Sequence, residues 1–357
     1  MFLRILSICL IVFSISACSK NKTENNTNTT AIAANAQGKP AKDAPFVKVP
    51  LGLSEDLKIP ADNPMTLDKV MLGHMLYFDK RLSADGTVSC ATCHSPEEGW
   101  SDKDPVSSGI KGQKGTRHAP TVINSTYMAL QFWDGRAKNL EEQALGPQIN
   151  PVEMGNPNHD VVVDRIKKIP AYVDLFQKAF GGPPTKDRIV QAIASFERTV
   201  LSGNSKYDQF VAGNTNALND SEKRGKDLFF GKAMCVTCHN GPNFSDSQFH
   251  NLGVGMNKEK PDLGRYEQTK VEKDKGAFKT PMLRDLEKHK PFMHDGSQKT
   301  LEEVVEFYDQ GGEANPNLDP LIHKLNLTPQ EKTDLVNFLK ALNGNPYPTI
   351  AEPKLPQ

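Results

Sequence analysis

Two short cysteine-histidine motifs carry the clearest chemistry in this sequence. One reads CATCH and ends at His94, and the other reads CVTCH and ends at His239. In a C-x-x-C-H motif the two thiols can form thioethers with the vinyl groups of one haem, and the next histidine can bind the iron. Such thiol pairs also bind zinc, but a histidine directly after both pairs favours haem. The sequence therefore predicts two covalently bound haem c groups, attached at Cys90, Cys93, Cys235 and Cys238.

The start of the chain has the features of an export signal. It reads MFLRILSICLIVFSISACSK, with an apolar run too short to span a membrane comfortably and small residues before Cys18. This pattern resembles a bacterial lipoprotein box, so we expect a signal peptide over residues 1–18 and a periplasmic protein anchored by lipid at Cys18. A plain secretory signal is the alternative. Cys9 would be lost with the signal, which leaves no cysteine outside the two motifs for a disulfide.

The next segment and the charge balance narrow the list of partners. Residues 19–50 are rich in Asn, Thr and Ala without apolar periodicity, which predicts a disordered tether. Lys plus Arg and Asp plus Glu number 43 each, so the chain lacks the net charge of a nucleic-acid-binding protein. We therefore expect no nucleic-acid partner, and membrane contact only through the N-terminal lipid.

Both motifs lie within a longer internal repeat. GHMLYFDK precedes the first motif as GKDLFFGK precedes the second, and the frame D-G-x-x-K-x-L-E-E follows each motif once. Such a repeat indicates that one folding unit has been duplicated. We expect a mainly α protein with two cytochrome c-like haem domains in tandem, joined and interrupted by long loops. The N-terminal domain would span residues 51–203 and the C-terminal domain residues 204–357.

Helical periodicity predicts how the first unit packs. Its opening helix and its terminal helix should each bury one apolar face. The residues on these faces are Leu67, Met71, Met75 and Phe78 in the opening helix, and Ile189, Ile193 and Phe196 in the terminal helix. His74 aligns with Lys226 in the repeat, so we expect it at the surface.

The two copies differ at positions that could do chemistry. The repeat pairs Pro147 in the first copy with Tyr308 in the second. If this segment crosses the distal side of each haem, the first iron is open and the second can be bound by a phenol oxygen. The first copy also has Gln143 and Glu153, an amide and a carboxylate that suit proton transfer during cleavage of a peroxide bond. A solvated loop charge is the simpler interpretation of Glu153.

Several longer segments resemble the bacterial dihaem cytochrome c peroxidase and MauG superfamily. They include GHMLYFDKRLS, APTVINSTYMALQFWDGRAKNLEEQALGPQINPVEMG and FKTPMLRDLEKHKPFMHDG, and the likeness runs from about residue 49 to the C-terminus. In that family the N-terminal haem is the peroxidatic site, and the C-terminal haem passes electrons to it. The resemblance implies that Glu153 is the distal acid-base, that Gln143 is its active-site neighbour, and that Trp133 lies between the haems.

The sequence departs from the family pattern in three places. The loop SPEEGWSDKDPVSSGIKGQKGTR lacks the histidine that usually caps the resting peroxidatic iron. Tyr308 stands where members usually have a methionine as sixth ligand of the second haem, which resembles MauG; Met282 and Met293 are the alternative ligands. His118 stands where the family often has an asparagine that helps to bind Ca²⁺, so calcium is possible but in doubt.

These observations predict a dihaem c-type peroxidase that reduces hydrogen peroxide to water. Its electrons would come from a small periplasmic donor, either a c-type cytochrome or a cupredoxin. A MauG-like oxidase acting on a protein substrate is the alternative within the same fold, and a non-enzymatic electron-transfer cytochrome is the alternative from another class. The presence of Glu153 and Gln143 in one copy only argues against a pure carrier. A homodimer is left open.

Overall fold

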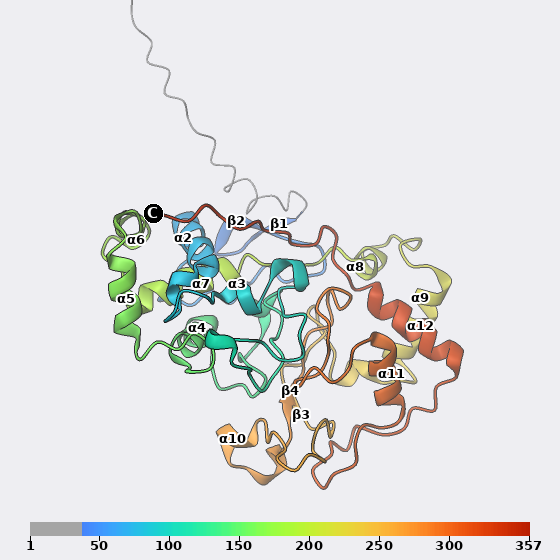
Figure 1. Cartoon of the computed structure of the whole chain (residues 1–357). Helices are drawn as coiled ribbons and strands as arrows, with labels where there is room; N and C mark the ends of the chain where they lie inside the picture. Colours follow the sequence, from blue (N-terminus) through green and yellow to red (C-terminus); the bar gives the residue numbers. More distant parts are fainter. Residues whose placement is uncertain (1–37) are drawn as a thin grey trace, which may run out of the picture.

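The computed structural model describes residues 38–357, and this part of the chain is mainly helical (Figure 1). The predicted signal peptide, Cys18 and most of the predicted tether lie outside the described residues. The α-helices are α2 (Leu67–Phe78), α3 (Cys90–Cys93), α4 (Leu140–Ile149), α5 (His159–Lys167), α6 (Pro170–Phe180), α7 (Lys186–Glu197), α8 (Lys206–Val211), α9 (Asp220–Phe230), α10 (Tyr266–Thr269), α11 (Leu301–Asp309) and α12 (Pro329–Lys340). The 3-10 helices are η1 (Lys80–Leu82), η2 (Pro96–Glu98), η3 (Ile110–Gly112), η4 (Ser125–Tyr127), η5 (Cys235–Thr237) and η6 (Glu272–Asp274). None of the helices described is long and apolar enough to cross a bilayer.

Short strands in the described chain form two antiparallel sheets, β1 with β2 and β3 with β4. Their bounds are β1 (Lys39–Ala41), β2 (Ala44–Val49), β3 (Phe249–His250) and β4 (Phe278–Lys279). The first sheet falls within the predicted disordered tether, so that prediction is wrong for residues 38–50. In β2 the side chains of Ala44, Val47 and Val49 are buried. The segment before β2 is polar, and it dominates the composition of residues 19–50. A prediction from composition therefore did not detect the short strand.

An N-terminal hydrophobic cluster forms where α2 packs on α7, with α5 and α6 beside them. The predicted buried face of α7 is confirmed, because Ile189, Ile193 and Phe196 are each at most 1% exposed. The predicted face of α2 is only partly correct: Phe78 is buried, but Leu67 is 39% exposed, whereas Leu76, outside the predicted face, is fully buried. Most positions of α2 are apolar, so periodicity could not single out one face.

Glycine decides which face of α2 meets α7. A Cβ atom added at Gly73 would overlap the carbonyl oxygen of Ala192 on α7. In the same way, a Cβ atom at Gly225 of α9 would overlap the carbonyl oxygen of Asp334 on α12. The two helix pairs therefore cross with their backbones in close approach. This explains why the segments GHMLYF and GKDLFF both have glycine at the same position.

Replacing Gly73 with alanine should destabilise the protein by about 1–3 kcal/mol, because the added methyl group must push α2 away from α7. Denaturant unfolding of the haem-loaded protein measures this change. Gly115→Ala is a suitable control, because the nearest atom to a Cβ there is 3.7 Å away. The control should change the free energy of unfolding by less than about 0.5 kcal/mol. Equal losses in both variants would contradict a specific role for the helix crossing.

A C-terminal hydrophobic cluster is built by α9, α11 and α12. The end of the chain leaves this cluster and runs back across the N-terminal one (Figure 1). Trp100 Nε1–H donates to the carbonyl oxygen of Pro348 at 2.9 Å, and His74 Nε2 donates to that of Ala351 at 2.9 Å. The last residues of the predicted C-terminal domain, 204–357, therefore pack on the other unit. They help to bury His74, which is 1% exposed, so the prediction of a surface position for it is wrong.

Candidate functional site

The first cysteine-histidine motif forms the short helix α3 and the residue after it. At the start of α3 the backbone N–H of Ser89 donates to the Thr92 hydroxyl at 2.9 Å. The Nδ1–H of His94 donates to the carbonyl oxygen of Pro120 at 2.9 Å. This bond fixes the tautomer that leaves the Nε2 lone pair available to a metal. Desolvation also lowers the pKa of His94, which favours the neutral imidazole that a metal requires.

The second motif has the same local arrangement on η5. The backbone N–H of His239 donates to the carbonyl oxygen of Cys235 at 2.8 Å, as that of His94 does to Cys90 at 2.9 Å. The Nδ1–H of His239 donates to the carbonyl oxygen of Phe244 at 3.0 Å. Within residues 38–357 no protein group forms a hydrogen bond with Nε2 of either histidine. Both imidazoles are therefore oriented by the backbone and have one free nitrogen.

A largely apolar cavity lies beside the second motif. Its wall includes Cys235, Cys238, His239, Leu283, Leu286, Val304, Val305, Tyr308 and Leu339. Neither of these cysteines forms a disulfide, and the same holds for those of the first motif. An apolar cavity with two thiols and an imidazole at its wall fits a c-type haem, whose macrocycle is apolar and whose vinyl groups and iron need those atoms. The residues present therefore fit the predicted cofactor.

All three candidate sixth ligands of the second haem line this cavity. Tyr308 lies on α11, one turn after Val304, while Met282 and Met293 come from the segment between β4 and α11. Burial raises the pKa of the Tyr308 phenol. Met293 has a φ of 71°, a backbone conformation that side-chain-bearing residues rarely adopt. The wall position alone does not distinguish the three side chains, so the assignment of Tyr308 remains a prediction.

The predicted acid-base residues of the first site lie on and just after α4. Gln143 and Pro147 are one turn apart on the helix, and Glu153 follows its end. The Nδ2–H of Asn150 donates to Oε1 of Glu153 at 2.7 Å, and burial raises the pKa of this carboxyl. Burial also raises the pKa of the Cys93 thiol to about 11, and the charge of Glu153 contributes to that rise. Glu153 is thus a half-buried carboxyl whose charge acts on the first motif, and its role as an acid-base group remains a prediction.

The repeated frame D-G-x-x-K-x-L-E-E forms the same helix entrance twice. Before α4 the backbone N–H of Lys138 donates to Oε2 of Glu142 at 2.9 Å, and before α11 that of Lys299 donates to Oε2 of Glu303 at 2.6 Å. In both copies the bond ties the residue before the N-cap to a glutamate in the first turn of the helix. The shared residues are therefore explained by local folding, and differences in chemistry must come from the positions that the copies do not share.

Trp133 is held by hydrogen bonds from both sides. Its Nε1–H donates to the carbonyl oxygen of His118 at 2.8 Å, and its own carbonyl accepts from the backbone N–H of Lys279 at 2.8 Å. Its ring meets that of His294 edge-on, with 6.5 Å between the centroids. Trp133 also lines the cavity that contains His239. The indole is thus fixed at the edge of the second haem site by segments from both halves of the chain.

Comparison with known proteins gives the family. A family model described as di-haem cytochrome c peroxidase matches residues 67–216. The cytochrome-c peroxidase IdrP1 of Pseudomonas sp. (strain SCT) is 38% identical over 358 residues, which cover 92% of each chain. The methylamine utilization protein MauG of Methylorubrum extorquens is 38% identical over 353 residues, 98% of this chain and 96% of that protein. The chain belongs to the di-haem cytochrome c peroxidase and MauG family.

A solved structure agrees with this membership of the di-haem peroxidase family. The crystal structure of a MauG-like protein associated with microbial copper homeostasis matches with a TM-score of 0.76 and 34% identity, covering 83% of this chain and 95% of that one. The resemblance predicted from the sequence is confirmed, and so is a mainly helical fold. Relatives named as peroxidases and as MauG match at the same 38% identity. Membership of the family therefore shows the dihaem class. It does not show whether the chain acts as the relatives named peroxidases do or as those named MauG do.

His118 offers no free nitrogen to a cation. Its Nε2 lies 3.0 Å from the Ser101 hydroxyl, and its Nδ1 lies 3.1 Å from the carbonyl oxygen of Asp104. Its pKa is lowered to about 4, chiefly by burial, so the ring is neutral. The calcium ion considered from the resemblance would gain no ligand from this side chain.

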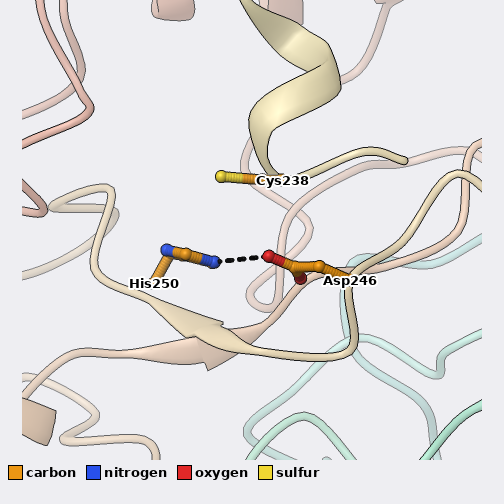
Figure 2. A group of neighbouring side chains, drawn as sticks. All are labelled: Cys238, Asp246 and His250. Atoms are coloured by element: carbon orange, nitrogen blue, oxygen red, sulfur yellow. Dashed lines mark hydrogen bonds and ion pairs between the residues drawn. The ribbon is translucent and has the colours of Figure 1, made fainter. Parts of the chain in front are cut away.

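Figure 2 shows three side chains with the spacing of metal ligands, Cys238, Asp246 and His250. His250 Nε2 donates to a carboxylate oxygen of Asp246 at 3.1 Å, and its Nδ1 donates to one of Asp319 at 2.7 Å. An imidazole that donates from both nitrogens is protonated and has no lone pair for a metal. The sulfur of Cys238 belongs to the haem motif. We therefore interpret the group as a charged hydrogen-bond cluster at the edge of the second haem site.

Sequence reasoning missed two polar residues of that site, His250 and Lys279, and both line the cavity. The sequence gives no signal for His250, because its partner Asp319 is far away in the chain. Lys279 stands between apolar Phe278 and Thr280 in a short strand, and a lysine in such a position is an available signal for a buried charge. Neither residue could be assigned before the fold brought the segments together.

Proposed function

We propose that this protein is a periplasmic dihaem c-type peroxidase that reduces hydrogen peroxide to water. The observation that carries the proposal is the asymmetry of the two copies. Glu153 and Gln143 lie on and after α4 in the first copy, whereas α11 of the second copy has Val304 and Tyr308 facing its cavity. A partly buried acid-base group beside only one motif suits peroxide cleavage at that motif.

The chain's own residues would supply proton transfer and orientation. His94 would hold the haem iron, which would supply the redox chemistry at one of the two peroxide oxygens. The Glu153 carboxylate would accept a proton from that oxygen and return it to the leaving oxygen, while Asn150 holds the carboxylate in place. Gln143 would orient the peroxide through its amide. The balance is one hydrogen peroxide, two protons and two electrons to two molecules of water.

Electrons would enter through the second haem and pass by Trp133. The donor we propose is a reduced c-type cytochrome or cupredoxin of the periplasm. Trp133 suits this path because hydrogen bonds to His118 and Lys279 fix its indole at the edge of the second cavity. A rigid aromatic group needs little rearrangement when charge passes it.

We further propose that both haems are covalent and that the chain is a tandem duplication anchored by lipid at Cys18. The matching helix crossings at Gly73 and Gly225 and the matching entrances of α4 and α11 support duplication. Haem c attachment takes place outside the cytoplasm, in agreement with the export signal. Mass spectrometry of the mature protein should give two haem masses and one lipidated cysteine. A mass without haem would contradict covalent attachment.

A MauG-like activity is the second candidate, and Tyr308 is the observation that favours it. A phenolate ligand would lower the potential of the second haem and make it a poorer relay for ordinary donors. The oxidising equivalents would then be used on a side chain of another protein. The carrier hypothesis is weaker, because an electron carrier has no use for a buried carboxyl beside one haem.

Stopped-flow mixing with hydrogen peroxide tests the proposal. With a reduced periplasmic cytochrome present, the protein should consume peroxide catalytically and oxidise two equivalents of cytochrome for each peroxide. The oxidised protein mixed with stoichiometric peroxide and no reductant provides the contrast. A long-lived high-valent spectrum there, without turnover of any donor, would favour the MauG-like candidate. No reaction under either condition would leave the carrier as the function.

A further inference from the structure

Lys279 is a buried cation without a protein partner. The residue is 8% exposed, and it is the last residue of the short strand β4. Among residues 38–357, no carboxylate or carbonyl accepts a hydrogen bond from its ammonium group, although its backbone N–H donates to the carbonyl oxygen of Trp133. Burial lowers the pKa of Lys279 to about 8. A charge taken out of water in this way requires an anion to offset the loss of hydration.

Asp134, which follows Trp133 in the chain, and Asp262 are both paired with arginine. Arg117 pairs with Asp134 at 2.7 Å and with Asp262 at 2.6 Å. The guanidinium of Arg265 donates to the carbonyl oxygens of Asp134 and Gly135 at 2.8 and 3.0 Å. These bonds give the guanidinium groups of Arg117 and Arg265 acceptors from the protein, whereas the ammonium of Lys279 has none among residues 38–357. Lys279 itself lines the apolar cavity that contains the second motif.

We propose that Lys279 binds a propionate carboxylate of the haem held by His239. The proposal depends on the haem sites of the proposed function but not on peroxide as the substrate. Propionates are the carboxylates that a haem brings into its cavity, and an ammonium group at the apolar wall can pair with one of them. The cation also favours the ferrous state, because reduction lowers the positive charge at the iron.

Removing this charge should therefore make the second haem harder to reduce. In Lys279→Met, the ratio of ferrous to ferric second haem at a fixed applied potential should fall about tenfold, equivalent to about 59 mV for a one-electron couple. Lys279→Arg keeps the charge and should stay near the wild-type value. Lys270→Met is the matched control, because Lys270 is an exposed lysine paired with Glu267 at 2.8 Å.

Spectroelectrochemical titration of both haems in the holoprotein measures these ratios, and a pyridine haemochrome assay counts the haems. Loss of one haem in Lys279→Met with recovery in Lys279→Arg would also support the proposal. Equal potentials in Lys279→Met and Lys270→Met would overturn it, as would a shift confined to the first haem. Failure of both Lys279 variants to assemble would indicate a packing role and overturn it as well. These titrations contain no peroxide, so an error in the proposed reaction would not change their outcome.

Discussion

Changing Glu153 to glutamine should lower the rate of peroxide turnover by about 10²–10⁴-fold, the usual contribution of a general acid-base. Glutamine keeps the size of the side chain and can still accept the hydrogen bond from Asn150, which is 2.7 Å long in the wild-type structure. It cannot take a proton from bound peroxide. Initial rates with a reduced cytochrome at saturating peroxide measure the effect, which should fall on kcat more than on KM.

Glu97→Gln is the matched control for this variant. Glu97 is an exposed carboxylate three residues after His94. Its replacement removes one negative charge near the first motif, as Glu153→Gln does, but leaves the proposed proton-transfer group unchanged. Its turnover should stay near that of the wild type. Full activity in Glu153→Gln would contradict the acid-base assignment. Equal losses in both variants would point to a long-range charge effect instead.

The pH profile of turnover tests the same carboxyl in another way. Burial raises the pKa of Glu153 above its ordinary value. The carboxyl must be ionised to accept the first proton, so activity should be constant at pH values above the raised pKa and fall as the pH drops through it. This acidic limb should be missing from the residual activity of Glu153→Gln. A limb that persists unchanged in the variant belongs to another group.

The chemistry attached to short local patterns could be predicted from the sequence. A C-x-x-C-H motif specifies its own turn, because the backbone N–H of its histidine donates to the carbonyl oxygen of its first cysteine in both copies. The imidazole of His239 is also oriented by a neighbour in the chain, Phe244, whereas that of His94 depends on the more distant Pro120. The terminal helix of the first unit was predicted correctly, since its apolar residues follow one clear stripe. Comparison of the repeats also separated shared folding residues from Glu153 and Tyr308.

Features made by contacts between distant segments could not be predicted. The face of α2 depends on a glycine that meets Ala192 more than a hundred positions later. His74 is buried because the end of the chain returns to cover it. The place of Lys279 on the cavity wall, with no acceptor for its ammonium group among residues 38–357, also follows from the fold. In each case, local composition is compatible with several environments and tertiary packing selects one.

Changing Tyr308 to methionine should raise the reduction potential of the second haem by roughly a few tenths of a volt, within the range of about 0.8 V that axial ligands span. A hard phenolate favours ferric iron, whereas a soft thioether favours ferrous iron. Burial raises the pKa of the free phenol, so Tyr308 stays protonated unless iron binding displaces its proton. The size of the shift therefore reports directly on ligation.

Potentiometric titration of the variant measures this shift, and Met282→Leu and Met293→Leu are its controls. Both controls should keep the wild-type potential, although both methionines line the same cavity as Tyr308. A shift in either control with none in Tyr308→Met would make that methionine the ligand. The potential also decides between the two candidate reactions, because a second haem at higher potential takes electrons more readily from ordinary periplasmic donors. Tyr308→Met should therefore raise the rate of cytochrome-driven peroxide reduction, and an unchanged rate would mean that the second haem does not limit electron entry.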